Sequence, residues 1–316
     1  MLNREPNKQD LLDADKRIRS HVHHTPIFSS RLINIMLECK LYFKCENFQR
    51  VGAFKIRGAT NAVLSFKYEI LSKGVATHSS GNHAAALAYS ASMKGVPAYI
   101  VMPSNAPQIK KNAVQEYRGK IIYCEPTLQA REETLAKVVQ ETGANFIHPY
   151  DDYSVIAGQA TVAKEVFEEI RDLDYIITPV SGGGLLSGTC LSARYFSPST
   201  KVIGVEPKGA DDAFRSIRDG IIYPSTNPKT ICDGLLAQLS DKTFSIIRNN
   251  VHKIITVEDG SIIKAMKLIW ERMKIIVEPS AAVPLAAVIE NPKKFVKKRI
   301  GIILSGGNVD LEKLPW

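Results

Sequence analysis

The sequence lacks any apolar run long enough to cross a membrane. A membrane-spanning helix needs about 20 apolar residues, and no stretch of the 316-residue chain approaches that length. The opening segment, MLNREPNKQD, is polar and charged, whereas a secretion signal carries an apolar core. We therefore expect a cytoplasmic protein that makes no contact with a membrane.

Cysteine is also scarce. The chain has five cysteines, an odd number, and none of them form a CxxC pair. This pattern argues against a disulfide framework and against a zinc cluster. Reduced thiols fit the cytoplasm.

Acidic residues are fewer than basic ones, which gives a formal net charge of +9. Such a charge can serve nucleic-acid binding. However, the lysines and arginines are spread along the chain, and only Lys110–Lys111 and residues 292–299 are densely basic. We expect a solvated basic surface that attracts anionic ligands, with no nucleic-acid partner.

What the chain does have is a repeated alternation of apolar runs and amphipathic stretches. It runs from GVATHS (74–79) to KIIYCEP (120–126) and resumes from DYIITPV (174–180) to RIGIILSGG (299–307). Alternation of this kind predicts parallel sheets with helices on both faces. The two blocks indicate an α/β protein with two open parallel-sheet domains.

Polar or glycine-rich turns directly follow three of the predicted strands, at the edge where parallel sheets collect ligands. SGGGLLSG (181–188) is suited to hold a phosphate on backbone amides at a helix start, or it is a tight turn that needs glycine. Judged alone, SSGNH (79–83) is better explained as a helix cap, and SGGN (305–308) as a turn.

Lys55 stands in the apolar stretch VGAFKIRG, ahead of a predicted helix. A buried ammonium is costly unless it is paired, deprotonated or used covalently. Desolvation favours the neutral amine, which can attack a carbonyl. A reactive lysine and a phosphate-binding loop are together what a pyridoxal phosphate enzyme needs.

The segment GVEPKGADD (204–212) places carboxylates at and after a strand end. Such a loop can bind Mg²⁺ or Ca²⁺ through oxygen ligands, or Asp211 or Asp212 caps the next helix, and from the residues alone the cap is favoured. The histidines at 21, 23 and 24 lie in a predicted exposed turn, where we do not expect a metal site.

In their order along the chain, from about Thr25 to Asp310, these motifs resemble the serine/threonine dehydratases and serine racemases of the fold-type II pyridoxal phosphate enzymes. The matching stretches are ENFQRVGAFKIRGA, HSSGNHAAALAY, GVPAYIVMP, HPYDD with IAGQAT, SGGGLLSG, GVEPKGADD, VEPSAA and LSGGNVD. The resemblance implies a tryptophan synthase β-like fold with a small mobile domain (74–150), a large cofactor-binding domain (1–73 plus 151–316) and a site between them. It also implies a homodimer.

The resemblance further implies a role for individual residues. Lys55 would carry the cofactor and act as the catalytic base, with Ser80 as the acid/base on the opposite face. The other implied cofactor contacts are Phe54, Asn82, Ser181, Gly182, Gly183, Gly184, Leu185, Glu278 and Ser305. The implied substrate contacts are Ser79, Ser80, Gly81, Asn82 and His83. A cation, Mg²⁺ or else Mn²⁺ or Ca²⁺, would bind to Glu206, the carbonyl of Ala210 and Asp212.

The activity that the resemblance implies is loss of ammonia from L-threonine or L-serine, which gives 2-oxobutyrate or pyruvate. Racemisation of serine is the alternative, and threo-3-hydroxyaspartate is a third substrate whose second carboxylate needs a cationic partner that the sequence does not identify. A nicotinamide oxidoreductase would also use SGGGLLSG, but Ser187 replaces the third glycine of that motif and Lys55 stays unexplained.

Three features depart from the resemblance. Ala53 stands where many relatives have serine, and Tyr150 stands where the animal racemases have an asparagine near their nucleotide site, so we do not predict activation by ATP. The chain ends at Trp316, soon after Ser305. We therefore expect no regulatory domain of the kind found in biosynthetic threonine enzymes.

Overall fold

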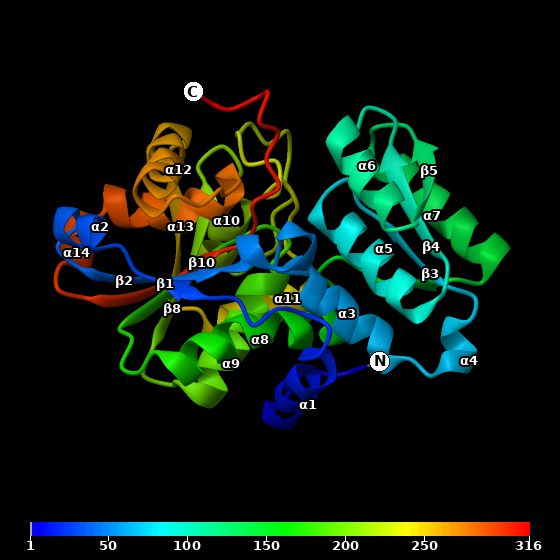
Figure 1. Ribbon diagram of the computed structural model, residues 1–316, viewed down its shortest axis with the longest axis horizontal. Coiled ribbons are helices and arrows are strands. Elements are labelled where there is room, and N and C mark those ends of the chain that lie inside the picture. Colours follow the sequence, from blue (N-terminus) through cyan, green and yellow to red (C-terminus); the bar gives the residue numbers. More distant parts are fainter. Residues whose placement is uncertain (1) are drawn as a thin grey trace.

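The computed structural model describes residues 2–316 and contains two sheets, each with helices on both faces (Figure 1). The larger sheet has six strands in the order β1-β2-β10-β7-β8-β9, and the smaller has four in the order β5-β4-β3-β6. The predicted α/β fold with two parallel sheets is confirmed. One strand differs from the prediction, since β1 runs antiparallel to β2.

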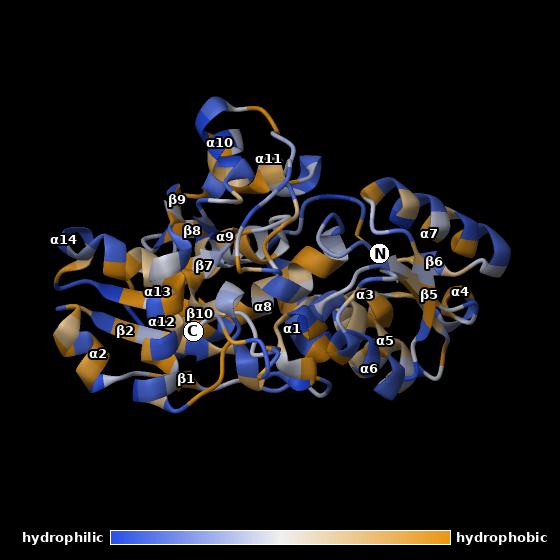
Figure 2. Cartoon of the chain, turned by 90° about the horizontal axis from the view of Figure 1, so that it is seen from above, coloured by the Kyte–Doolittle hydropathy of each residue, from blue (hydrophilic) through white to orange (hydrophobic). Residues whose placement is uncertain are grey.

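The strands of the larger sheet are β1 (Ile27–Phe28), β2 (Lys40–Cys45), β7 (Tyr175–Pro179), β8 (Lys201–Pro207), β9 (Lys253–Val257) and β10 (Arg299–Leu304). The last four are apolar runs that the sequence predicted, whereas β1 and β2 were not predicted. Continuous apolar strands belong in a sheet that is covered on both faces. Figure 2 shows the hydrophobic residues concentrated along the sheets and the helix sides that face them.

Two groups of helices cover this sheet. One face packs against α1 (Lys8–Ile18), α8 (Tyr153–Glu169), α9 (Gly184–Phe196) and α11 (Asp241–Asn250). The other packs against α2 (Arg31–Met36), α12 (Asp259–Met273), α13 (Pro279–Glu290) and α14 (Pro292–Phe295). The short helix α10 (Asp212–Asp219) follows β8.

The smaller sheet consists of β3 (Val75–His78), β4 (Ala98–Pro103), β5 (Lys120–Cys124) and β6 (Asn145–Phe146). Helices α5 (Asn82–Lys94) and α6 (Gln108–Glu116) pack on one face, and α7 (Leu128–Thr142) packs on the other. All four strands lie within residues 74–150, but α3 (Lys55–Ser65) and α4 (Tyr68–Leu71) also contribute to this core. The exact domain boundaries and the mobility of residues 74–150 stay predictions.

Helix α3 lies between the two sheets (Figure 1) and contacts both α5 and α8. Its position matters for function, because Lys55 is its first residue. Two short 3-10 helices, Glu46–Phe48 and Arg50–Gly52, connect it to β2. None of the helices in residues 2–316 is long and apolar enough to span a bilayer.

Candidate active site

The sheet order brings four of the predicted segments to one edge of the larger sheet. Strands β2, β10, β7 and β8 are neighbours. Lys55 follows β2, Ser305 follows β10, the glycine loop (181–185) follows β7, and Glu206 lies near the end of β8. The loop 79–83, called the substrate loop after its predicted role, follows β3 in the smaller sheet. Contacts between this loop and the other four segments must therefore join the two sheets.

The Lys55 side chain lies among neutral groups. Its Nζ donates a hydrogen bond to the carbonyl of Pro149 at 3.0 Å and lies 5.3 Å from the centre of the Phe54 ring. Within residues 2–316 it forms no ion pair with a carboxylate. Burial therefore lowers the pKa of Lys55 to about 8, so the neutral amine is far more populated near physiological pH than in an ordinary lysine, although the ammonium still predominates.

The glycine loop ends in backbone amides that are free to bind an anion. Helix α9 begins at Gly184 after Gly183, whose φ of 88° favours glycine, and no side chain caps the helix. In the part of the chain that the structure describes, the amides of residues 182–185 donate no hydrogen bonds to other backbone groups. Free amides at a helix start, with its partial positive charge, suit a phosphate.

Tyr150 connects this loop to Lys55. A Cβ atom on Gly182 would lie 2.4 Å from the Tyr150 ring, so only glycine fits beneath that ring. The residue before Tyr150 is Pro149, whose carbonyl accepts the Lys55 hydrogen bond. The Ser181 hydroxyl accepts a hydrogen bond from the amide of Ala237 at 3.1 Å, which fixes the other side of the loop.

Asn82 and Glu278 join the smaller sheet to the larger one. The Asn82 side-chain nitrogen lies 3.0 and 3.2 Å from the two carboxylate oxygens of Glu278, and its oxygen accepts from Asn308 at 2.9 Å. Burial, with the charge of Asp233 adding to it, raises the pKa of Glu278 to about 7. The amide of Phe54 donates to the carbonyl of Ser305 at 3.0 Å, so that segment lies beside the start of α3.

In the substrate loop the prediction of a simple helix cap is wrong. Helix α5 begins at Asn82, and the residue in the capping position is Gly81, which provides no side-chain hydrogen bond. The Ser79 hydroxyl instead accepts from the amide of Gly81 at 3.3 Å. The amides of Asn82 and His83 donate to no backbone carbonyl between residues 2 and 316, so this helix start is also suited to an anion such as a carboxylate.

His83 is buried and neutral. Burial, followed by the nearby charge of Lys55, places its pKa well below the usual value. Its Nε2 lies 3.3 Å from the carbonyl of Ile147, while Nδ1 is buried with no partner from Leu2 to Trp316. Ser80 lies partly exposed beside it in the same loop.

The candidate cation site contains two buried carboxylates. Burial, and then the charge of Asp212, raise the pKa of Glu206 well above its usual value, and burial raises the pKa of Asp212 to about 6. One carboxylate oxygen of Asp212, Oδ2, is buried without a hydrogen-bond partner in the described chain. A divalent cation bound there, with the Ala210 carbonyl as a third ligand, would compensate both charges.

Glu206 also serves as the cap that the sequence assigned to Asp211 or Asp212. Its oxygens accept from the amides of Ala213 at 3.2 Å and Phe214 at 2.7 Å, in the first turn of α10. Asp211 occupies the capping position but makes no capping bond. The cap prediction failed because the capping carboxylate comes from a neighbouring strand.

No group of three or more histidine, cysteine, aspartate or glutamate side chains within residues 2–316 is arranged to hold a metal. Two of the amino-terminal histidines have polar neighbours of other kinds. His23 Nδ1 lies 3.0 Å from the carbonyl of Phe48, and His24 Nε2 lies 3.4 Å from Glu169. Any cation at Glu206 and Asp212 therefore needs backbone and water oxygens as further ligands.

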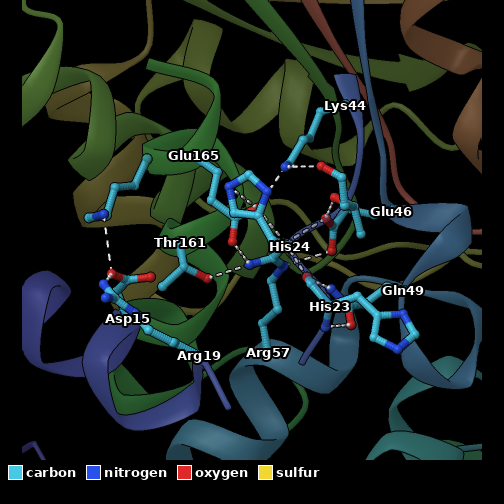
Figure 3. Close-up of polar contacts among 12 residues, drawn as sticks. Asp15, Arg19, His23, His24, Lys44, Glu46, Gln49, Arg57, Thr161 and Glu165 are labelled. Carbon is cyan, nitrogen blue, oxygen red and sulfur yellow. Dashed lines mark hydrogen bonds and ion pairs between the residues drawn. The ribbon is translucent and has the colours of Figure 1, made fainter. Parts of the chain in front are cut away.

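A buried ion cluster, which was not predicted from the sequence, holds the start of α3 (Figure 3). Arg57, two residues after Lys55, lies between Glu46 and Glu165, with nitrogen–oxygen distances of 2.6 to 2.8 Å. Lys44 lies 2.6 Å from Glu165 and completes a neutral set of two cations and two anions. Because Arg57 belongs to the first turn of α3, this cluster fixes the helix that carries Lys55.

The chain matches the family model described as pyridoxal-phosphate dependent enzyme over residues 18–306. It is 52% identical to the beta-hydroxyaspartate dehydratase of Paracoccus denitrificans, over 98% of this chain and 99% of the relative. It is 48% identical to the L-threo-3-hydroxyaspartate ammonia-lyase of Saccharomyces cerevisiae, over 98% and 95%. Its structure matches the crystal structure of serine racemase from Dictyostelium discoideum with a TM-score of 0.92 at 48% identity, over 96% and 99% of the two chains.

Proposed function

The chain belongs to the pyridoxal-phosphate-dependent enzymes, and on that premise we propose that it removes the β-hydroxyl group and the amino group of a small hydroxy amino acid. The products are a keto acid and ammonia. L-Threonine, L-serine and L-threo-3-hydroxyaspartate are the candidate substrates. The observation that carries the proposal is the unpaired Lys55 amine, with a pKa of about 8, close to a loop of free amides.

The residues present fit the cofactor. The amides of residues 182–185 would hold its phosphate. Asn82 would bind its phenolic oxygen, and Ser305 would bind its ring nitrogen. Phe54 and Glu278 would lie beside the ring. When bound, the cofactor supplies an electron sink for the α-carbon of the substrate. A serine hydroxyl protonates the ring nitrogen less than a carboxylic acid does, which favours prompt elimination or reprotonation.

The chain's own groups then handle the substrate and its proton. The free amides at the start of α5 would bind the substrate carboxylate, together with Ser79 and the neutral His83. The Lys55 amine would take the α-proton. Its pKa of about 8 suits this role, because the amine is neutral often enough to accept a proton and basic enough to hold it.

Racemisation of serine is a second candidate activity. The Ser80 hydroxyl lies in the substrate loop, partly exposed, and is not held by another side chain among the hydrogen bonds of residues 2–316. A hydroxyl there could return a proton to the α-carbon from the side opposite Lys55. The balance between elimination and racemisation would then depend on how fast the β-hydroxyl leaves.

We also propose Mg²⁺ or a similar cation at Glu206, Ala210 and Asp212, a homodimer, and a cytoplasmic location. The unpartnered Asp212 oxygen supports the cation. Exposed apolar side chains on α2 (Leu32, Ile35 and Met36) provide a surface that a second copy could cover. The five free cysteines fit a reducing compartment.

The experiment is to incubate the cofactor-loaded protein with each of the three substrates, with and without Mg²⁺. Keto acid is followed by a coupled assay and D-serine by chiral chromatography. Keto acid from any of the substrates supports the proposal, and D-serine in excess of pyruvate makes the protein chiefly a racemase. Absence of both products would refute the proposed activity.

The Lys55→Ala variant is the matched control. It should lose the visible absorption that borohydride bleaches in the wild-type protein, because no amine remains to bind the cofactor covalently. Retention of that absorption would mean that another lysine carries the cofactor.

A further inference from the structure

An ion pair next to the substrate loop joins the parts of the protein that contain the two sheets. Lys110, in α6 of the smaller sheet, pairs its Nζ with the carboxylate of Asp233, which precedes α11 in the larger part of the protein. The two residues are 123 positions apart in the sequence. The other lysine of the basic pair, Lys111, points elsewhere, since its Nζ donates to the carbonyl of Ser104 at 2.8 Å.

Lys110 lies against the segment that we assign to the substrate carboxylate. Its Nζ lies 3.9 Å from the point where a Cβ atom on Gly81 would stand. Gly81 immediately precedes the free amides of Asn82 and His83. A ligand whose first carboxylate binds to those amides therefore lies beside the Lys110 ammonium.

The partner of Lys110 is easily exchanged. The Lys110 side chain is 20% exposed and that of Asp233 is 55% exposed. Ion pairs that are accessible to solvent contribute little to stability. A ligand carboxylate can therefore replace Asp233, and Asp233 can turn toward water without leaving a buried charge unpaired.

The charges around the substrate loop should affect the binding of a dicarboxylic substrate more than that of a monocarboxylic one. Glu278, which contacts Asn82, and Asp233 are the acidic groups here, and Lys110 and Lys55 are the cations. A second substrate carboxylate would meet Asp233 and Glu278 as repulsive neighbours. The Lys110 ammonium, once released from Asp233, would compensate its charge on this side of the loop.

We propose that Lys110 is the specificity-determining residue that binds the second carboxylate of a dicarboxylic hydroxy amino acid of the 3-hydroxyaspartate type, exchanging Asp233 for the substrate. This inference rests on the proposed function, and it selects among the candidate substrates of that function. In the unliganded protein Asp233 competes for Lys110 and lowers the affinity for any dicarboxylate.

The first test compares Lys110→Gln with the wild-type protein, both loaded with pyridoxal phosphate. The ratio of kcat/KM for L-threo-3-hydroxyaspartate to that for L-serine should fall by roughly 10- to 100-fold, the loss of one hydrogen bond between charged groups. Lys111→Gln, which removes the same charge one residue away, should leave this ratio unchanged. Retained cofactor absorption shows that each variant is folded.

The second test measures binding without turnover. Calorimetry should give tighter binding of malonate than of propionate, and Lys110→Gln should remove the difference. Asp233→Asn should strengthen malonate binding several-fold, because it removes the competing carboxylate while leaving Lys110 in place.

The outcomes separate this inference from the proposed function. If the wild-type protein turns over L-serine but binds malonate no better than propionate, the inference fails and the proposed function stands. If no substrate reacts but malonate binding still requires Lys110, the proposed activity fails and the dicarboxylate site stands. An unchanged ratio and unchanged malonate binding in Lys110→Gln would overturn the inference.

Discussion

Replacement of Arg57 by methionine should strongly destabilise the protein, although Arg57 makes no contact with substrate. Its guanidinium is fully buried and donates to both carboxylate oxygens of Glu46 and of Glu165 (Figure 3). Methionine fills much of the same space but carries no charge. The variant therefore removes the charge with a small change in packing.

The magnitude follows from the charges that remain. Arg57 and Lys44 balance Glu46 and Glu165 in the wild-type cluster. Methionine leaves one uncompensated negative charge in the interior, and removal of one partner of a buried pair costs about 3 to 5 kcal/mol. The total free energy of unfolding of a typical domain is only about 5 to 15 kcal/mol, so a large part of the stability should be lost.

The pH dependence gives a second criterion. Burial alone would raise the pKa of Glu165, but the Arg57 and Lys44 charges outweigh it and hold that pKa below its usual value. A carboxylate with a lowered pKa stabilises the fold above its unfolded pKa, and that contribution is lost as the pH falls through the folded pKa. The difference between wild type and variant should therefore be largest at neutral pH and shrink in acid.

The assay is urea unfolding at about pH 7 and at about pH 3.5, below the ordinary pKa of a glutamate, followed by tryptophan fluorescence. The control is Arg215→Met, which breaks a partly exposed pair with Asp211 at 2.8 Å and should cost less than about 1 kcal/mol. If Arg57→Met does not fold, Arg57→Lys can replace it. This variant keeps the charge but loses the fork-shaped hydrogen bonding, so its loss of unfolding free energy should lie between those of Arg215→Met and Arg57→Met. A loss for Arg57→Met no larger than that of the control, or the same loss at both pH values, would refute the reasoning.

Three further predictions concern the site itself. The rate at which the apo-protein takes up pyridoxal phosphate should rise about tenfold from pH 6 to pH 7 and level off above the Lys55 pKa of about 8; a flat profile in stopped-flow absorbance would contradict the lowered pKa. Ser80→Ala should suppress D-serine formation and spare keto acid, whereas equal loss of both products would remove the role of Ser80. Mg²⁺ should raise the thermal unfolding midpoint of the wild-type protein but not of Asp212→Asn, and an equal rise in both would place the cation elsewhere.

The fold was predictable because its signal is local. Seven strands, β3 to β5 and β7 to β10, are apolar runs that alternate with helical stretches, so the alternation identifies the α/β class without knowledge of contacts. The position of the glycine loop was predictable for a similar reason, since a loop after β7 must lie at the carboxyl edge of the sheet. The start of α3 was harder to predict, because the helix begins at Lys55 itself without a capping side chain.

The two capping predictions failed for different reasons. Capping of α5 by Ser or Asn was a reasonable expectation, yet Gly81 occupies that position and leaves the amides free. Capping of α10 comes from Glu206 on β8, which no local pattern reveals. Lys110 and Asp233 form a pair only because α6 packs near the segment before α11. A dense basic pair in the sequence gave no sign that one of its two lysines reaches the substrate loop.

The stretch around Lys55 contains two cations with different tasks. Lys55 and Arg57 are two residues apart, which places their side chains about 200° apart around α3. Lys55 therefore faces the neutral surroundings of Pro149, where its pKa falls, while Arg57 faces Glu46 and Glu165 in the core. The reactive lysine could be recognised from the sequence because its apolar neighbours are adjacent in the chain. The role of Arg57 could not be recognised in the same way, because the two carboxylates that compensate its buried charge lie on other segments of the chain. Lys55 and Arg57 thus belong to one helical turn, the first turn of α3. A change to Arg57 should therefore alter the position of the Lys55 side chain by moving that turn.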